Sequence, residues 1–135
     1  MNHEEHEVHE GVIMLEPLSN TVIGLAISVH KQLGPGLLES VYETCLCHEL
    51  LEMGINFHRQ LPIKIEYKGV FLDAGYRADI IVEESLILEL KTVEKITSLH
   101  HAQLLTYMKL GKFRTGILLN FNSELLKDGM KRFVL

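Results

Sequence analysis

The chain has 135 residues, the size of one ordinary domain, and 47% of them are hydrophobic, which supports a real core and excludes a disordered chain. No apolar run approaches the roughly 20 residues that a membrane-spanning helix needs. The polar, acidic N-terminus is unlike a secretory signal, so we expect a cytoplasmic protein. The net charge of −5 disfavours nucleic-acid binding, but residues 90–135 hold eight bases and three acids, so the C-terminal third is the expected electropositive face.

Residues 1–16 differ from the rest in composition. They contain five glutamates and three histidines, and no lysine or arginine. A loose metal site at His3, His6 and His9 is one reading, but a flexible acidic arm fits the composition better. There is no internal repeat or linker after it, so residues 17–135 are expected to form a single domain.

Two helices are predicted at the start of this domain. Apolar residues recur at helical spacing over residues 21–33, with Thr21 as a cap, and Gly34-Pro35-Gly36 ends the helix. A second helix is expected from about Leu37 to Met53, and Gly54 is its natural terminator.

The pattern then changes to the period of two that is typical of strands. Apolar and polar residues alternate over 61–67, and Lys68-Gly69 fits a two-residue hairpin turn. Residues 70–82 form the return strand. After the turn at Glu83-Glu84-Ser85, a strongly apolar strand is expected from Leu86 to Lys91.

A helix, a buried strand and a short final strand complete the chain. Ser98 can cap a helix over about residues 99–110, which Gly111 closes. Residues 115–121 read as a buried strand, and Arg132-Phe133-Val134 as a last short one. This order predicts an α/β (α+β) fold with a mixed central sheet and helices packed on it.

Charged residues interrupt two of the apolar strands. Residues two apart on a strand share a face, so Glu89 and Lys91 point the same way. In the register that opposes Asp79 to Glu89, Val82 pairs with Leu86 across a three-residue loop. A two-residue loop would put the two acids on opposite faces. We therefore predict the odd loop or a bulge.

Such a pair of acids points to a metal site. Two neighbouring carboxylates repel, which raises a pKa unless a cation lies between them, and oxygen ligands suit Mg²⁺ or Mn²⁺. The Lys91 ammonium can hold an attacking water or stabilise charge on a phosphoryl oxygen. The alternative is a surface hairpin with a solvated Glu–Lys pair, which the spacing alone favours. The setting of the charges within apolar strands favours the metal site.

At these residues the chain resembles the PD-(D/E)XK nuclease superfamily, and within it the small GxxExxY proteins. The resemblance covers about residues 17–135, and Ala78 stands where the superfamily name has proline. The segments that carry it are Gly36-Leu37-Leu38-Glu39-Ser40-Val41-Tyr42, Tyr76-Arg77-Ala78-Asp79, Leu88-Glu89-Leu90-Lys91, Gln103-Leu104-Leu105-Thr106-Tyr107 and Leu118-Leu119-Asn120-Phe121.

The resemblance implies a restriction-endonuclease-like core, in which a helix, three antiparallel strands, a helix and a strand follow one another. It implies that Asp79 and Glu89 ligate the metal, with the Leu90 backbone carbonyl as a third ligand. It assigns Glu39 to the metal or to a water on it, and makes Lys91 the catalytic lysine.

The resemblance also implies that Gln103 and Tyr107 act together on a phosphate or on Lys91, because their spacing puts them on one helix face. Some of these residues have structural alternatives. Glu39 could be an ordinary first-turn glutamate, Gln103 could bond the sheet edge, and Tyr107 could be a core residue.

The function implied is a Mg²⁺-dependent nuclease, with Mn²⁺ as a substitute, that hydrolyses phosphodiester bonds by a metal-activated water. Its expected partner is nucleic acid, with DNA favoured over RNA, and neither a membrane nor an organic cofactor is expected. The alternative is a catalytically silent module that binds nucleic acid or a protein on the same fold. Specificity would come from a homodimer or from a partner protein, and the sequence does not choose between them.

Overall fold

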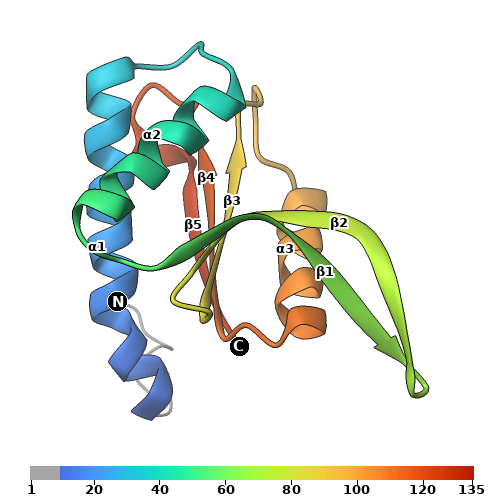
Figure 1. Ribbon diagram of the computed structural model, residues 1–135. Coiled ribbons are helices and arrows are strands. Elements are labelled where there is room, and N and C mark those ends of the chain that lie inside the picture. Colours follow the sequence, from blue (N-terminus) through green and yellow to red (C-terminus); the bar gives the residue numbers. More distant parts are fainter. Residues whose placement is uncertain (1–9) are drawn as a thin grey trace.

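A computed structural model describes residues 10–135, so residues 1–9 of the arm predicted over residues 1–16 lie outside them. The described chain begins with two helices, and three strands, a helix and two further strands follow (Figure 1). They are α1 (Glu10–Leu33), α2 (Glu39–Glu52), β1 (Phe57–Tyr67), β2 (Val70–Val82), β3 (Leu86–Lys91), α3 (Ser98–Gly111), β4 (Thr115–Asn120), the short 3-10 helix η2 (Leu126–Gly129) and β5 (Met130–Val134).

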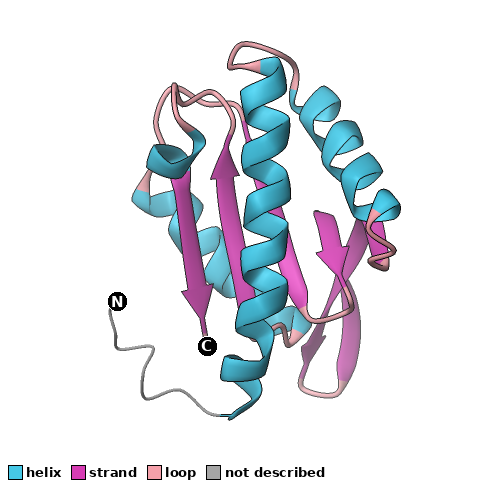
Figure 2. Cartoon of the chain, turned by 90° about the vertical axis from the view of Figure 1, so that its left-hand side faces the viewer, coloured by secondary structure: helices cyan, strands magenta, loops and turns pink. Residues whose placement is uncertain are grey.

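The strands of the described chain form one five-stranded mixed sheet in the order β1-β2-β3-β4-β5. Strands β3 and β4 run parallel, joined through α3, and the other neighbours are antiparallel. Helices α1 and α2 cover one face of the sheet and α3 covers the other (Figures 1 and 2). The predicted α/β fold with a mixed sheet is confirmed, and it is the restriction-endonuclease-like arrangement.

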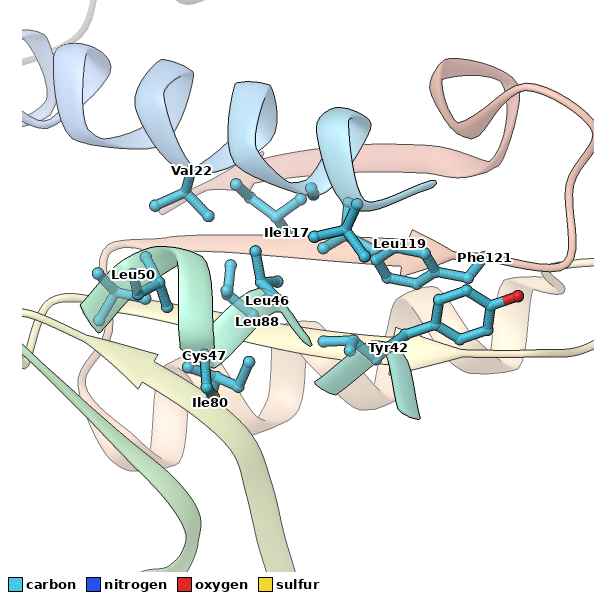
Figure 3. Packing of buried hydrophobic residues seen from close by; sticks show 14 of the residues in the cluster. Val22, Tyr42, Leu46, Cys47, Leu50, Ile80, Leu88, Ile117, Leu119 and Phe121 are labelled. Atoms are coloured by element: carbon cyan, nitrogen blue, oxygen red, sulfur yellow. The ribbon is translucent and has the colours of Figure 1, made fainter. Parts of the chain in front are cut away.

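The core lies on both faces of the sheet. The larger cluster joins α1 and α2 to one face, where Leu46 and Leu50 of α2 meet Leu88 of β3 and Leu119 of β4 (Figure 3). The smaller cluster lies under α3, where Leu104 and Met108 are fully buried. Strand β3 is therefore covered on both faces, which explains its near-continuous apolar sequence.

The two hairpins follow the predicted turns. Lys68 and Gly69 both have positive φ, as a two-residue hairpin turn requires. Strands β2 and β3 pair Val82 with Leu86 and Ile80 with Leu88, so the three-residue loop and its register are confirmed. Beyond that ladder, β1 and β2 leave the sheet together as a projecting ribbon (Figure 1).

Two helix boundaries were predicted wrongly. The first helix begins at Glu10 and not after Thr21, so residues 10–16 of the predicted arm are helical. The apolar spacing of Leu15, Leu18 and Val22 continues the helical repeat upstream, and Pro17 removes one hydrogen bond without ending the helix.

No helix of the described chain is long and apolar enough to span a membrane.

The third helix is capped by Thr97 and not by Ser98. The Thr97 side chain accepts a hydrogen bond from the His100 amide, and the His100 ring accepts one from the Thr97 amide at 3.0 Å. Histidine thus takes the place that glutamate or glutamine usually has in a reciprocal cap. At the other end, Gly111 stays helical and Lys112 adopts the left-handed conformation.

Candidate functional site

Asp79 and Glu89 lie where β2 and β3 separate. They are the next residues of the confirmed register after the last ladder pair. The Asp79 side chain replaces the next ladder bond, because its Oδ2 accepts a hydrogen bond from the Leu90 backbone amide at 2.8 Å. The structure therefore brings the two predicted carboxylates together at one strand end.

The Glu89 carboxylate is buried and only partly satisfied. The residue is 6% exposed, its Oε2 lies 3.9 Å from Lys91 Nζ, and its Oε1 has no hydrogen-bond partner in the described chain. Burial first, and the charge of Asp79 second, raise the pKa of Glu89 to about 8. A cation held between the two acids would oppose both effects.

Two tyrosine rings form a wall beside this carboxylate. Tyr76 of β2 stacks on Tyr107 of α3, with ring centroids 3.5 Å apart and an angle of 14° between the planes. Burial and the nearby Glu89 raise the pKa of both hydroxyls. The structure thus places Tyr107 at the site, and it adds Tyr76, to which sequence reasoning gave no role. The available signal was its place in the motif segment Tyr76-Arg77-Ala78-Asp79.

Gln103 is hydrogen-bonded to none of the other predicted site residues in residues 10–135, and its action on a phosphate stays a prediction. It is exposed on α3, one turn before Tyr107. Its side chain makes no hydrogen bond to another residue of the described chain, so neither the sheet-edge bond nor a contact with Lys91 is formed.

Glu39 approaches from the first turn of α2. Partial burial and then Asp79 raise the pKa of Glu39, while Lys91 and a backbone hydrogen bond with Thr92 lower it. The residue as a whole is exposed, yet its carboxylate is within electrostatic range of both charged partners on the sheet. Its position is therefore compatible with the role that the resemblance implies.

Tyr42 fixes the loop that leads into α2. It is fully buried and stacks on Phe121, with ring centroids 4.5 Å apart (Figure 3). Its hydroxyl donates a hydrogen bond to the Gly34 carbonyl and accepts one from the Leu37 amide at 3.1 Å. Gly36 between them has a φ of 100°, which favours glycine. The glycine and tyrosine of the motif thus act on the backbone, and they set where α2 begins.

Sequence reasoning missed a polar bridge between α2 and the sheet. Gln60 Nε2 donates hydrogen bonds to Glu43 Oε1 at 2.8 Å and to Asp79 Oδ1 at 3.3 Å. Glu43 is 7% exposed, and its Oε2 accepts from Arg59 Nε at 3.0 Å. The one available signal was the position of Glu43 one helical turn after Glu39, which puts both acids on the same side of α2.

Asn120 holds the chain that follows Lys91. It pairs with Lys91 in the parallel ladder, and its amide makes two hydrogen bonds with the backbone of Val93, at 3.1 Å and 2.9 Å. The Phe121 amide also donates to the Lys91 carbonyl at 2.9 Å. The Lys91 side chain, 23% exposed, therefore extends from a rigid strand end.

The residues present fit a hard divalent cation. Mg²⁺ usually takes one or two protein carboxylates and keeps several waters. Asp79 and Glu89 offer two, and the Leu90 carbonyl points the same way as its amide, toward Asp79, because both groups of a strand residue lie on one side. No group of three His, Cys, Asp or Glu side chains in residues 10–135 is arranged to hold a metal. Two carboxylates and one carbonyl leave room for the waters that a Mg²⁺ ion keeps.

Comparison with known families places the chain in one superfamily. A model of the PD-(D/E)XK nuclease superfamily matches residues 16–133. The chain belongs to this superfamily. The resemblance drawn from the motifs is thus confirmed at the level of the superfamily. No curated protein and no solved structure matches the chain.

Membership in the PD-(D/E)XK superfamily gives the fold a chemical context. The superfamily consists generally of hydrolytic nucleases that use divalent metals, and its substrates are nucleic acids. The site described above lies within the matched residues.

Proposed function

We propose that this chain is a Mg²⁺-dependent nuclease that hydrolyses phosphodiester bonds in DNA, with Mn²⁺ as a substitute metal. The observation that carries the proposal is the buried, partly unsatisfied Glu89 beside Asp79, with Lys91 two residues further on the same face. Buried like charges are costly unless a cation compensates them. We also assign the chain to the GxxExxY group, because Gly36 and Tyr42 shape the loop before Glu39.

Asp79 and Glu89 would hold the metal, with the Leu90 carbonyl as a third donor and Glu39 as a ligand or a partner of coordinated water. When bound, the divalent cation supplies charge neutralisation at the phosphate and a more acidic water. The residues of the chain supply the geometry. Asp79 is fixed by the Leu90 amide at 2.8 Å, and Glu89 by the packing around it.

Lys91 would hold the attacking water or stabilise the developing charge on a phosphoryl oxygen. Its ammonium lies 3.9 Å from Glu89 Oε2, so it stays near the metal ligands without being bound tightly to either. The stacked pair Tyr76 and Tyr107 would keep bulk water from the far side of Glu89, which strengthens the electrostatic interactions there.

The test is cleavage of supercoiled and linear double-stranded DNA, single-stranded DNA and RNA in Mg²⁺ and in Mn²⁺. The wild type is compared with Asp79→Ala and Lys91→Ala, and with the matched surface controls Asp73→Ala and Lys64→Ala on the projecting ribbon. We expect metal-dependent cutting of DNA that both site variants lose and both controls keep. Cutting that survives in Asp79→Ala and Lys91→Ala would overturn the proposal. Binding of nucleic acid without cutting by the wild type would favour the silent module instead.

A further inference from the structure

Gln60 has a backbone conformation that is unusual for a strand. Its φ is 52°, although it lies inside β1. The other non-glycine residues of the described chain with positive φ lie in turns or at a helix end: Lys68, Glu83, Glu84 and Lys112. Such conformations persist only where the surroundings hold them, and they gather at functional sites. The strain at Gln60 therefore calls for a specific explanation.

The ladder between β1 and β2 is interrupted at this residue. Arg59 pairs with Ile80, and the same register resumes two residues further along β1, so Gln60 lies across from Asp79 without a ladder pairing. The Gln60 carbonyl instead accepts a hydrogen bond from Arg77 Nη1 at 3.3 Å. The interruption turns the Gln60 side chain to the position where it contacts both α2 and Asp79.

The Gln60 amide joins two carboxylates without adding charge. Its nitrogen donates at 2.8 Å to Glu43 and at 3.3 Å to Asp79, and an amide nitrogen carries two hydrogens, one for each acid. Glu43 cannot move to meet the amide, because it is buried and bonded to Arg59 at 3.0 Å. Glu43 of α2 thus sets the orientation of the Gln60 side-chain amide, and this amide in turn holds Asp79 Oδ1.

We propose that Gln60 is a positioning residue that links buried Glu43 to Asp79 and fixes the rotation of the Asp79 carboxylate for metal binding. This inference rests on the proposed metal role of Asp79. The Leu90 amide holds one oxygen of Asp79, and Gln60 holds the other. Without Gln60 the carboxylate can rotate about the Leu90 bond, so its second oxygen loses a fixed direction. Loss of such an outer partner typically costs about 10–100-fold in metal affinity or activity.

The first test uses Gln60→Gly, which removes the amide and is compatible with a φ of 52°. Lys68→Gly is the matched control, because Lys68 has a φ of 50° at the ribbon turn, away from the site. Mn²⁺ affinity is measured by isothermal titration, with Asp79→Ala to identify binding at the site. We expect Gln60→Gly to bind Mn²⁺ about 10–100-fold more weakly and Lys68→Gly to bind like the wild type. Equal affinity in Gln60→Gly and the wild type would overturn the inference while leaving the metal site itself intact.

A second variant tests the link to α2. Glu43→Gln keeps the side-chain length but removes the charged acceptor, so it should weaken Mn²⁺ binding in the wild-type background. In the Gln60→Gly background, Glu43→Gln should change the Mn²⁺ affinity less than about twofold, because the effects of residues in one hydrogen-bond network are not additive. Additive effects would show that Glu43 does not act through Gln60. Thermal unfolding of each variant checks that the fold is retained.

The bridge also has a readout that needs no metal. In nuclear magnetic resonance spectra of the metal-free protein, we expect the two side-chain amide protons of Gln60 to exchange slowly and to shift in both Asp79→Ala and Glu43→Gln. Lys68→Gly should leave these signals unchanged. If the wild type bound no Mn²⁺ at Asp79, the proposed function would fail, and with it the metal role of Gln60. If the Gln60 amide signals did not respond to either acid, the bridge itself would be contradicted.

Discussion

The Asp79 carboxylate accepts a hydrogen bond from the Leu90 backbone amide at 2.8 Å, at the point where the β2–β3 ladder ends. One side chain therefore completes the sheet through Oδ2, while its Oδ1 accepts a hydrogen bond from Gln60 Nε2 at 3.3 Å. Structure and chemistry are coupled in this residue, and the two roles can be separated by the choice of substitution.

Asp79→Asn should separate these roles. Its amide oxygen can still accept the Leu90 hydrogen bond, so we expect the free energy of unfolding to fall by about 1 kcal/mol or less while Mg²⁺ binding is lost. Asp79→Leu also loses the hydrogen-bond acceptor, so its free energy of unfolding should fall by about 1–3 kcal/mol more. Urea unfolding and isothermal titration measure the two effects. Equal free energies of unfolding in the two variants would show that the hydrogen bond from the Leu90 amide does not contribute to stability.

Glu89 should make the metal-free protein less stable as the pH rises. The folded pKa of about 8 lies above the ordinary value of 4.5, so the folded state binds more protons than the unfolded state between these values. The stabilising contribution is complete below about pH 4.5 and is lost as the pH approaches 8. A tenfold change in the proton affinity of one group corresponds to about 1.4 kcal/mol, so the pH-dependent part of the stability amounts to a few kcal/mol.

Glu89→Gln should remove most of this pH dependence, because its amide stays neutral at every pH. Urea unfolding at intervals from pH 4.5 to pH 8 gives the slope for both proteins. Mg²⁺ should raise the stability of the wild type most at the alkaline end, where Glu89 is ionised, and should not stabilise Glu89→Gln. A wild-type slope that persists in Glu89→Gln would assign the effect to another group.

Tyr42→Phe should loosen the loop before α2 while keeping the core. The ring can still stack on Phe121, but the hydrogen bonds to Gly34 and Leu37 are lost. We expect a loss of about 1–3 kcal/mol in the free energy of unfolding. Tyr67→Phe is the control, since Tyr67 is 60% exposed and should change stability by less than about 0.5 kcal/mol. Equal effects of the two changes would contradict the role of the Tyr42 hydroxyl.

Tyr107→Ala should act on the site through Tyr76. Loss of the stacked pair should lower the free energy of unfolding by about 0.5–1.5 kcal/mol, in addition to the effect of the lost buried surface. Water then gains access to Glu89. We therefore expect the pKa of Glu89 to fall toward its ordinary value, as carboxyl carbon resonances would report. Tyr107→Phe keeps the ring and should leave that pKa nearly unchanged. A change of similar size in both variants would rule out shielding by the ring.

Local signals in the sequence were enough for most of the fold and for the pair of acids. The alternation of strand faces and the three-residue loop after Val82 determine the register that brings Asp79 beside Glu89. These features depend on residues close in sequence, so the rules for turns and for strand faces are sufficient to find them.

The parts that were missed depend on contacts between distant segments. The bridge from Glu43 through Gln60 to Asp79 spans 17 and 19 residues of sequence, and periodicity carries no information about such contacts. The burial of Tyr76 against Tyr107 likewise requires the packing of α3 on the ribbon.

Anomalous scattering from crystals grown with Mn²⁺ tests most directly whether Asp79 and Glu89 form a metal site. We expect an anomalous peak within coordination distance of Asp79 and Glu89, and no such peak in crystals of Asp79→Ala. A well-occupied peak elsewhere, with Asp79 and Glu89 free of metal in the wild type, would contradict the claim that these two acids form the metal site of a nuclease.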